Sequence, residues 1–384
     1  MHAPVSSALV SSASFTATLT APHAIGLAGT TTGTLTGTLT PTLAAGGSPF
    51  ASSSAHPANT CAGTTLGQAA AFGPAVADGG APDRDAVLAH LGLVARGTIG
   101  LLPQFPRLRR LMGSQQRWLL CQAAFALHHE AAQAGEETEA VPGLTAGHLL
   151  DLILEYHAAS RNTVSAFVQE MRAARVFTDL PSRGDRRVRP LAPGEAASEA
   201  MRQWFLGQLQ VLDVIDGGAR ACRLMADPAL IAIAQPLAAR TLMADDAWRE
   251  PAGPLGCILW TDAGNLLIDD LMARAATLAP ASGIRTGMTL EVEEFGVTAL
   301  ADRYAVSCTH VRRLCAQAEE TGMLLRTGKR SCRRLIIAPA LTQAYADWQA
   351  RRLTAIDAAF RAALSIRSGA AEPPVRARPR LAVS

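Results

Sequence analysis

The sequence predicts a mainly α-helical fold with small β-hairpins, built from two copies of one structural unit. Alanine and leucine dominate, whereas aromatic residues make up only 5% of the 384 residues, and this composition favours helix over strand. Two segments related by an offset of 147 residues share one order of apolar, polar and basic positions without a gap. Internal repeats of this kind usually mark duplicated structural units.

The chain opens with a low-complexity segment, residues 1–82, that is rich in Ser, Thr, Ala, Gly and Pro and poor in bulky side chains. Such a segment cannot bury enough apolar surface to fold, so it is predicted to be a disordered tail. A Gly217-Gly218 pair breaks the remainder. The predicted parts are a first domain at 83–216, a second domain at 217–368 and a flexible tail at 369–384.

Amphipathic helices are expected on both sides of the repeated segments. Asp83 is a candidate cap for the first of them. In the helix after the first copy, the apolar residues that recur at helical spacing are Met201, Phe205, Leu209 and Leu212. The expected helices cover residues 83–95, 117–130, 195–215, 219–244, 264–278 and 341–366.

Each copy contains a second helix, which follows a short helix and a turn. Ser160 in the first copy and Ser307 in the second precede this helix, where a serine hydroxyl accepts a hydrogen bond from a free backbone N–H group. One face of the helix is apolar at helical spacing and is predicted to be buried. The apolar positions are Val164, Phe167, Val168 and Met171 in the first copy and Val311, Leu314, Cys315 and Ala318 in the second.

The opposite face of the same helix carries polar and basic side chains. They are Arg161, Asn162 and Ser165 in the first copy and Thr309, His310, Arg312 and Arg313 in the second. Hydrogen-bonding side chains near the start of a helix suit contacts with base edges in the major groove of DNA.

A β-hairpin is predicted after this helix in both copies. Six arginines and two acids lie between Arg172 and Arg189, and seven basic residues and two acids lie between Arg312 and Arg334. Basic hairpin tips can contact phosphates or enter a minor groove. A helix-turn-helix followed by a basic hairpin is a winged helix. The expected strands cover 176–180 and 187–191 in the first copy and 323–327 and 333–337 in the second.

The first copy begins at Ile153 and the second at Leu300, and the longer segment that contains the first copy begins at Leu144 and reads LTAGHLLDLILEYHAASRNTVSAFVQEMRAARVFTDLPSRGDRRVRPLAPGE. It combines the second helix with Asp185-Arg186-Arg187 in the hairpin and Pro193-Gly194-Glu195 at the start of the next helix. In this pattern the chain from Leu144 to about residue 215 resembles the MarR family of bacterial transcriptional regulators. The resemblance implies that residues 160–165 face the major groove and that Arg187 is the arginine of the wing. The second copy departs from the pattern, because Cys332 stands where the first copy has Asp185.

Regulators of this family normally form homodimers through their terminal helices. Two winged helices in one chain would instead make a single-chain pseudo-dimer, or a dimer with four winged helices. The predicted fold class is therefore mainly α with small β-wings, with tandem winged helix-turn-helix units packed on connecting helices and related by a pseudo-twofold repeat.

The predicted function is sequence-specific binding of double-stranded DNA by a cytoplasmic bacterial transcriptional regulator. Recognition helices are expected in major grooves and arginine-rich wings on phosphates or a minor groove. No cofactor, metal site or catalytic constellation is expected, whereas a small-molecule effector and a homodimer are open. The residues expected at DNA are Ser160, Arg161, Asn162, Thr163, Ser165, Arg172, Arg183, Arg186 and Arg187 in the first copy and Ser307, Thr309, His310, Arg312, Arg313, Lys329, Arg330, Arg333 and Arg334 in the second.

Other kinds of site are disfavoured by the sequence. Seven scattered cysteines without a CxxC pair argue against a disulfide framework or a structural zinc site. The adjacent His128 and His129 cannot share a helix face, which argues against a metal site. Cys315 is expected as a small buried apolar residue rather than as a redox sensor. No apolar run reaches the ~18 residues that a membrane span needs.

Three alternatives to a transcriptional regulator stay open. A replication initiator of the plasmid type, with tandem winged helices, would bind repeated origin sequences rather than a promoter palindrome. An adaptor whose winged helices contact proteins would keep its DNA affinity when four arginines are replaced by alanine. These arginines are Arg186, Arg187, Arg333 and Arg334. An enzyme would require chemistry that the sequence does not display.

Overall fold

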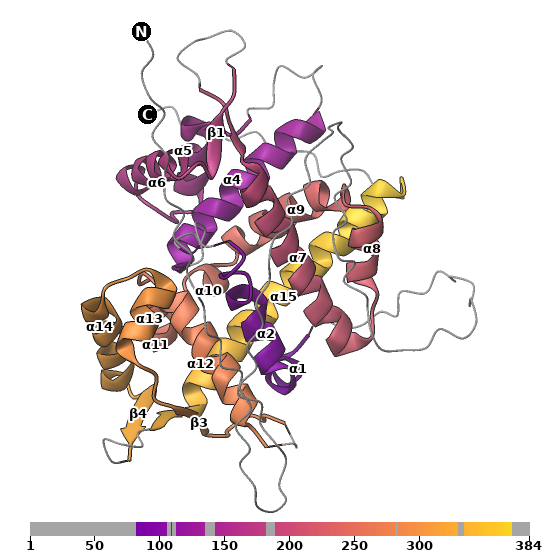
Figure 1. Ribbon diagram of the computed structural model, residues 1–384. Helices are drawn as coiled ribbons and strands as arrows, with labels where there is room; N and C mark the ends of the chain where they lie inside the picture. The colour runs from indigo at the N-terminus through magenta and orange to yellow at the C-terminus, as the bar shows by residue number, and fades with distance from the viewer. Residues whose placement is uncertain are drawn as a thin grey trace, which may run out of the picture. The chain divides into compact units, whose positions relative to one another are not determined.

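A computed structural model describes residues 82–105, 109, 113–134, 143–181, 189–280, 283–328 and 334–370. Within these ranges the chain is mainly helical with two small sheets, as the sequence predicts (Figure 1). The predicted tail at 1–82 lies outside the described residues except for its last position, and so does the C-terminal tail from residue 371.

Helices and one hairpin make up the first half of the described chain, which ends at Asp216. Their bounds are α1 (Arg84–Ala89), α2 (Leu91–Ile99), α4 (Gln115–Ala134), α5 (Ala146–Glu155), α6 (Arg161–Ala173), β1 (Phe177–Asp179), β2 (Leu191–Pro193) and α7 (Glu195–Asp216). The Asp83 side chain accepts a hydrogen bond from the Ala86 N–H at 2.8 Å, which confirms it as the cap of α1. The predicted helix at 83–95 is interrupted at His90, between α1 and α2.

The second half begins after Gly217, whose left-handed backbone (φ 75°) ends α7 as the sequence predicts. The predicted helix at 219–244 is divided into α8 and α9, and the strand β3 and the short helices α10 and α11 were not predicted. The elements are α8 (Arg220–Ala226), α9 (Leu230–Ala244), α10 (Asp246–Arg249), α11 (Gly253–Leu259), α12 (Gly264–Leu278), β3 (Leu290–Glu293), α13 (Val297–Tyr304), α14 (Cys308–Glu320), β4 (Leu324–Thr327), β5 (Arg334–Ile337) and α15 (Pro339–Arg367).

Helix α9 continues through Pro236 because α4 supplies the hydrogen bond that proline removes. A proline has no N–H to donate to the carbonyl four residues earlier, which here belongs to Ala232. The side-chain amide of Gln133 on α4 donates to this carbonyl instead. Nearby, the buried Gln235 amide donates to the backbone and side-chain oxygens of Gln122, at 3.0 and 2.9 Å. Polar side chains therefore fix the register of α4 against α9.

One hydrophobic core joins helices from both predicted domains. Helix α9 packs on α4 and α15, and α2 packs on α12, so the core crosses the predicted boundary at residue 216. Four tryptophans meet where α4, α7, α10 and α15 converge, with ring centroids 5.2 to 5.6 Å apart between neighbours. They are Trp118, Trp204, Trp248 and Trp348. The boundary at Gly217 ends a helix, but it does not separate two cores.

A buried polar cluster lies beside the tryptophans. The guanidinium of Arg352 on α15 lies 5.9 Å from the ring centroid of Trp204 and 5.8 Å from that of Trp348. The hydroxyl of Tyr345 donates to Asp269 of α12 at 2.8 Å. Burial raises the pKa of Asp269 to about 6, although the charge of Arg352 acts in the opposite direction. This cluster ties α15 to α7 and α12 at a cost in desolvation.

Candidate nucleic-acid interface

Two units of the structure carry the residues expected at DNA. The first unit comprises residues 143–194, with α5, α6, β1 and β2, and the second unit comprises residues 290–338, with β3, α13, α14, β4 and β5. In Figure 1, α5 and α6 lie at the upper left of the view, and α13 and α14 lie at the lower left. Helix α4 contacts α5, α6 and β2, while α11 contacts α14 and α12 contacts β3. Both units are thus mounted on the shared helical core.

The second helix of each unit begins at a serine cap, as predicted. The hydroxyl of Ser160 accepts a hydrogen bond from the Thr163 N–H at 3.2 Å. The hydroxyl of Ser307 accepts one from the His310 N–H at 3.1 Å. Both serines have extended backbone conformations, with φ of −76° and −75° and ψ of 160° and 151°. The cap therefore sets where α6 and α14 start, in the same way in both units.

The predicted buried face of this helix is confirmed in both units. All eight apolar positions have exposed fractions of 4% or less, which places them in the core. They are Val164, Phe167, Val168, Met171, Val311, Leu314, Cys315 and Ala318. Burial raises the pKa of the Cys315 thiol, so the structure agrees with a small apolar residue there.

The turn from this helix into the hairpin is also shared. The N–H of Val176 donates to the carbonyl of Met171 at 2.9 Å, and the N–H of Met323 donates to that of Ala318 at the same distance. The residue before each donor has a left-handed backbone, with φ 57° at Arg175 and 71° at Gly322. Glycine adopts this conformation without strain, whereas arginine does not.

The gapless alignment of the two hairpins is wrong. Phe177 lies opposite Pro193 in the first sheet, whereas Leu324, 147 residues beyond Phe177, lies opposite Ile337 in the second. The second hairpin is therefore three residues shorter between these partners. Counted from these partners, Arg334 corresponds to Pro190. The predicted match of Arg334 with Arg187 is therefore wrong.

Strand β2 also begins later than predicted, at Leu191 rather than at residue 187. The residue before it, Pro190, has no N–H to donate to a neighbouring strand, which explains why regular pairing starts after it. Its carbonyl accepts a hydrogen bond from the N–H of Leu180 at 2.8 Å, and the side chain of Arg189 is exposed.

The second unit has a third strand, for which the described part of the first unit has no counterpart. Strand β3 pairs with β5, and the sheet order is β3-β5-β4. In the first unit, the carbonyl of Leu144 accepts a hydrogen bond from the N–H of Leu191 at 2.8 Å, on the strand where a third strand would pair. The sequence LEVE of β3 alternates apolar and acidic residues, and its burial alternates with it. This alternation is the signal that could have revealed the strand.

The outer face of α6 is exposed and polar. Arg161, Asn162 and Ser165 are exposed, as expected for residues at DNA, and Thr163 is half-buried, with its hydroxyl 2.9 Å from the Ser160 hydroxyl. Arg161 forms no hydrogen bond or ion pair with any residue that the structure describes. Arg172, by contrast, forms an ion pair with Asp179 of β1.

The outer face of α14 is more constrained. Thr309, Arg312 and Arg313 are exposed, but the Nε2 atom of His310 lies 2.6 Å from the carbonyl oxygen of Asp262, in the turn before α12. Its Nδ1 atom lies 3.1 Å from the guanidinium of Arg313. His310 therefore tethers the N-terminal turn of α14 to the core and orients Arg313.

One glutamine on the outer face of α6 was missed. Gln169 is exposed and lies four positions after Ser165, so it continues the face of Asn162 and Ser165 by one helical turn. The residue 147 positions later is Ala316 on α14, which is exposed but carries no polar group. Helical spacing would have identified Gln169, whereas the repeat offset would not. At this position the first unit presents an amide and the second does not.

Several expected DNA contacts fall outside the described residues. They are Arg183, Arg186, Arg187, Lys329, Arg330 and Arg333. The expected contact of the second hairpin that the structure does describe, Arg334, is exposed and donates to Glu291 of β3 at 2.9 Å. Each unit thus retains described polar and cationic groups on its outer face, and each holds some of its positive charge in internal ion pairs, through Arg172 in the first unit and Arg334 in the second.

Histidine and cysteine side chains outside the two units are perturbed by burial. Burial lowers the pKa of His129 to about 4, and the adjacent His128 lowers it further. Burial also raises the pKa of Cys121 to about 12. Among the described residues, no group of three His, Cys, Asp or Glu side chains could hold a metal ion. None of the described helices combines the length and the apolar character that a membrane crossing requires.

In comparisons with known proteins, no family model, no characterised protein and no solved structure matches this chain. The geometry of the two units therefore carries the functional inference.

Proposed function

We propose that this protein binds double-stranded DNA through two winged-helix units and acts as a transcriptional regulator. One observation carries the proposal. Two helices at the same sequence offset begin at the same serine cap, bury the same face and present a polar outer face before an antiparallel hairpin. A helix with an exposed polar face fits the major groove of DNA. The hairpin follows it where the wing of a winged helix contacts the DNA backbone.

The outer faces carry the side chains that recognise bases. Asparagine and glutamine pair with the N6 and N7 edge of adenine, and arginine pairs with the O6 and N7 edge of guanine. In the first unit these groups are Asn162 and Gln169, and in the second unit the corresponding group is Arg312. Arg161, which has no partner among the described residues, lies at the start of α6, where its guanidinium suits a phosphate. The expected contacts thus include both base edges and backbone.

The shared core supports engagement of one duplex by both units. Because α9 packs on both α4 and α15, and the tryptophans join α4 to α10 and α15, the two units are carried by helices of one core, which favours a fixed distance between them. Winged units on one duplex are expected to contact half-sites about 34 Å apart, one helical turn. The protein is therefore expected to select paired half-sites at a fixed spacing.

Selection from random duplex DNA at low ionic strength tests this function with the full chain. We expect enrichment of a paired site, and binding that weakens steeply as salt rises because phosphate contacts release counterions. As a control, Arg96→Ala removes an exposed arginine on α2, outside both units, and should leave DNA binding unchanged. The proposal is overturned if no duplex is enriched, or if binding is insensitive to salt.

The arrangement of the enriched half-sites also separates regulation from replication initiation. A palindromic site located in promoters supports a regulator. Direct repeats that are clustered at an origin would instead support the initiator alternative, while leaving DNA binding intact. An adaptor would enrich no sequence.

A further inference from the structure

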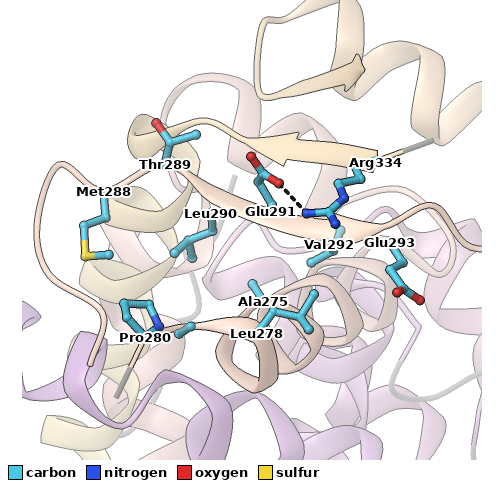
Figure 2. A pocket seen from close by; sticks show the side chains of 11 residues that line it. Ala275, Leu278, Pro280, Met288, Thr289, Leu290, Glu291, Val292, Glu293 and Arg334 are labelled. Carbon is cyan, nitrogen blue, oxygen red and sulfur yellow. Dashed lines mark hydrogen bonds and ion pairs between the residues drawn. The ribbon is translucent and has the colours of Figure 1, made fainter. Parts of the chain in front are cut away.

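A cavity of about 380 Å³ lies between the C-terminal end of α12 and strand β3 (Figure 2). The loop that carries Met288 closes one side, and the edge of the three-stranded sheet forms the other. Its volume falls within the roughly 300–1,000 Å³ of small-molecule sites. The cavity lies outside the outer face of α14, so the DNA proposal does not use it.

About half of the cavity lining is apolar. Leu278, Met288, Leu290 and Val292 form this apolar wall, together with alanines and a proline at the end of α12. Leu278 is 58% exposed, which is unusual for a large aliphatic side chain and leaves apolar surface uncovered. An apolar body placed against this wall would remove that surface from water.

The rim of the cavity carries an excess of negative charge. Glu291, Glu293 and Arg334 all line it, and Arg334 is bonded to Glu291 at 2.9 Å, as the dashed line in Figure 2 marks. Glu293 is exposed and forms no hydrogen bond or ion pair with any residue that the structure describes. One carboxylate is therefore uncompensated beside the apolar wall.

We propose that this cavity binds an organic cation with an apolar body, such as an aryl-alkyl amine, and that its occupancy regulates the second unit. The apolar body covers Leu278 and Met288, and the ammonium group pairs with Glu293. An anion of the same shape is repelled by the net negative rim. The regulatory part of this inference rests on the proposed DNA-binding function, whereas ligand binding does not.

Strand β3 couples the cavity to the second unit. Glu293 lies opposite Arg334 in the pairing of β3 with β5, and the helix α13 begins at Val297, four positions after Glu293. A cation at the rim competes with Arg334 for the carboxylate of Glu291. Binding therefore changes the hydrogen bonding of Arg334, the first residue of β5.

Calorimetric titration of the full chain tests the ligand class with phenylbutylamine, phenylbutyrate and phenylbutanol. We expect the amine to bind more tightly than the alcohol, and the carboxylate to bind most weakly. Glu293→Gln should weaken the amine about fivefold, the upper range for an exposed ion pair, and leave the alcohol unchanged. Leu278→Gln should weaken the amine and the alcohol together. Glu155→Gln, at an exposed glutamate on α5, is the matched control.

Equal affinity for the three compounds, or loss of amine binding in the control as in Glu293→Gln, overturns the cation site. The regulatory part is tested by the DNA affinity with and without saturating amine. A change of DNA affinity that disappears in Glu293→Gln supports it, and an unchanged affinity overturns it. If the protein binds no DNA but still prefers the amine, the proposed function fails while the ligand site stands.

Discussion

The two units share their caps and buried faces, but they are attached to the protein differently. The second unit contains a third strand, β3, whose Glu291 forms an ion pair with Arg334, and the contact of His310 with the turn before α12 tethers it to the core. In the first unit, one backbone hydrogen bond from Leu191 to Leu144 stands where the third strand would pair. Arg161 at the start of α6 is free of partners among the described residues.

The same pattern of cap, buried face and hairpin thus occurs with two different sets of supporting contacts. The first unit keeps cationic and amide groups available for a partner, including Gln169, where the second unit has Ala316. The second unit holds Arg326 and Arg334 in ion pairs with its own glutamates, and a cavity lies against its extra strand. We therefore expect the first unit to supply most of the sequence-specific contact and the second to supply weaker contact that can be regulated.

Removing the amides of the first outer face should have the largest effect. We expect Asn162→Ala with Gln169→Ala to lower affinity for the selected duplex about 100- to 1,000-fold, because each base contact contributes about 1–3 kcal/mol. Thr309→Ala with Arg312→Ala, on the outer face of α14, should lower it about tenfold. Fluorescence anisotropy with the selected duplex and a scrambled one measures both effects. Equal losses from the two pairs would remove the proposed inequality.

The response to acid should differ in sign between α4 and α12. Burial lowers the pKa of His129 from 6.5 to about 4, so the stability that its neutral form contributes above pH 6.5 is lost as the pH falls toward 4. Burial raises the pKa of Asp269 from 3.8 to about 6, so its contribution is present at low pH and is lost as the pH rises through 6. The pKa shift of each group changes the unfolding free energy by at most about 3 kcal/mol.

Urea unfolding of His129→Gln and Asp269→Asn between pH 4 and pH 7 measures these contributions. Relative to the original chain, His129→Gln should gain unfolding free energy as the pH falls. Asp269→Asn should lose it over the same change, whatever the constant penalty from leaving Arg352 without its carboxylate. Parallel pH profiles for the two variants would contradict the assigned burial.

The left-handed residues after α6 and α14 should respond in opposite directions. Gly322→Ala places a side chain in a strained backbone, so we expect unfolding free energy to fall by about 1 kcal/mol. Arg175→Gly relieves backbone strain in the folded state but raises the conformational entropy of the unfolded chain. We expect the unfolding free energy to rise by about 0.5 kcal/mol. A Cβ added at Gly322 meets no atom within 4 Å, so a steric clash does not confuse the comparison. The measurement is urea unfolding, and a loss in both variants would argue against shared turn strain.

The smallest effect should come from the tether of α14. His310→Ala removes the contact with Asp262, and we expect faster amide exchange in the first turn of α14 and at 260–263, corresponding to about 0.5–1 kcal/mol. Thr163→Ala is the matched change, because Thr163 is the residue 147 positions before His310. It should leave exchange in α6 nearly unchanged apart from the cap. Equal effects would mean that the tether does not constrain α14.

The second helix of each unit was predictable because local forces specify it. A serine cap and an apolar face at helical spacing were enough to predict α6 and α14, their start and their buried side chains. The missed elements depend on partners far along the chain. The four residues of β3 gain their hydrogen bonds only from β5, at residues 334–337, and α10 and α11 are too short for a helical period.

The candidate interface was predictable to the same degree. The exposed positions of Asn162, Ser165 and Arg312 follow from the buried face on the opposite side of each helix, and the same spacing could also have given Gln169. By contrast, the contact of His310 with Asp262 joins residues from separate elements, and no local spacing indicates it. The match of Arg334 with Arg187 failed because the two hairpins differ in length, and a fixed sequence offset does not show this difference.

The sequence by itself determined most of the longer helices, the caps Asp83, Ser160 and Ser307, and the apolar faces of α6 and α14, since these depend on neighbours within one or two helical turns. The tertiary structure decided that both units share one core, that the second unit has an extra strand and that its cations are partly paired. Those features depend on contacts between distant segments, where burial and the pairing of buried or neighbouring polar groups select one arrangement among many that the local pattern allows.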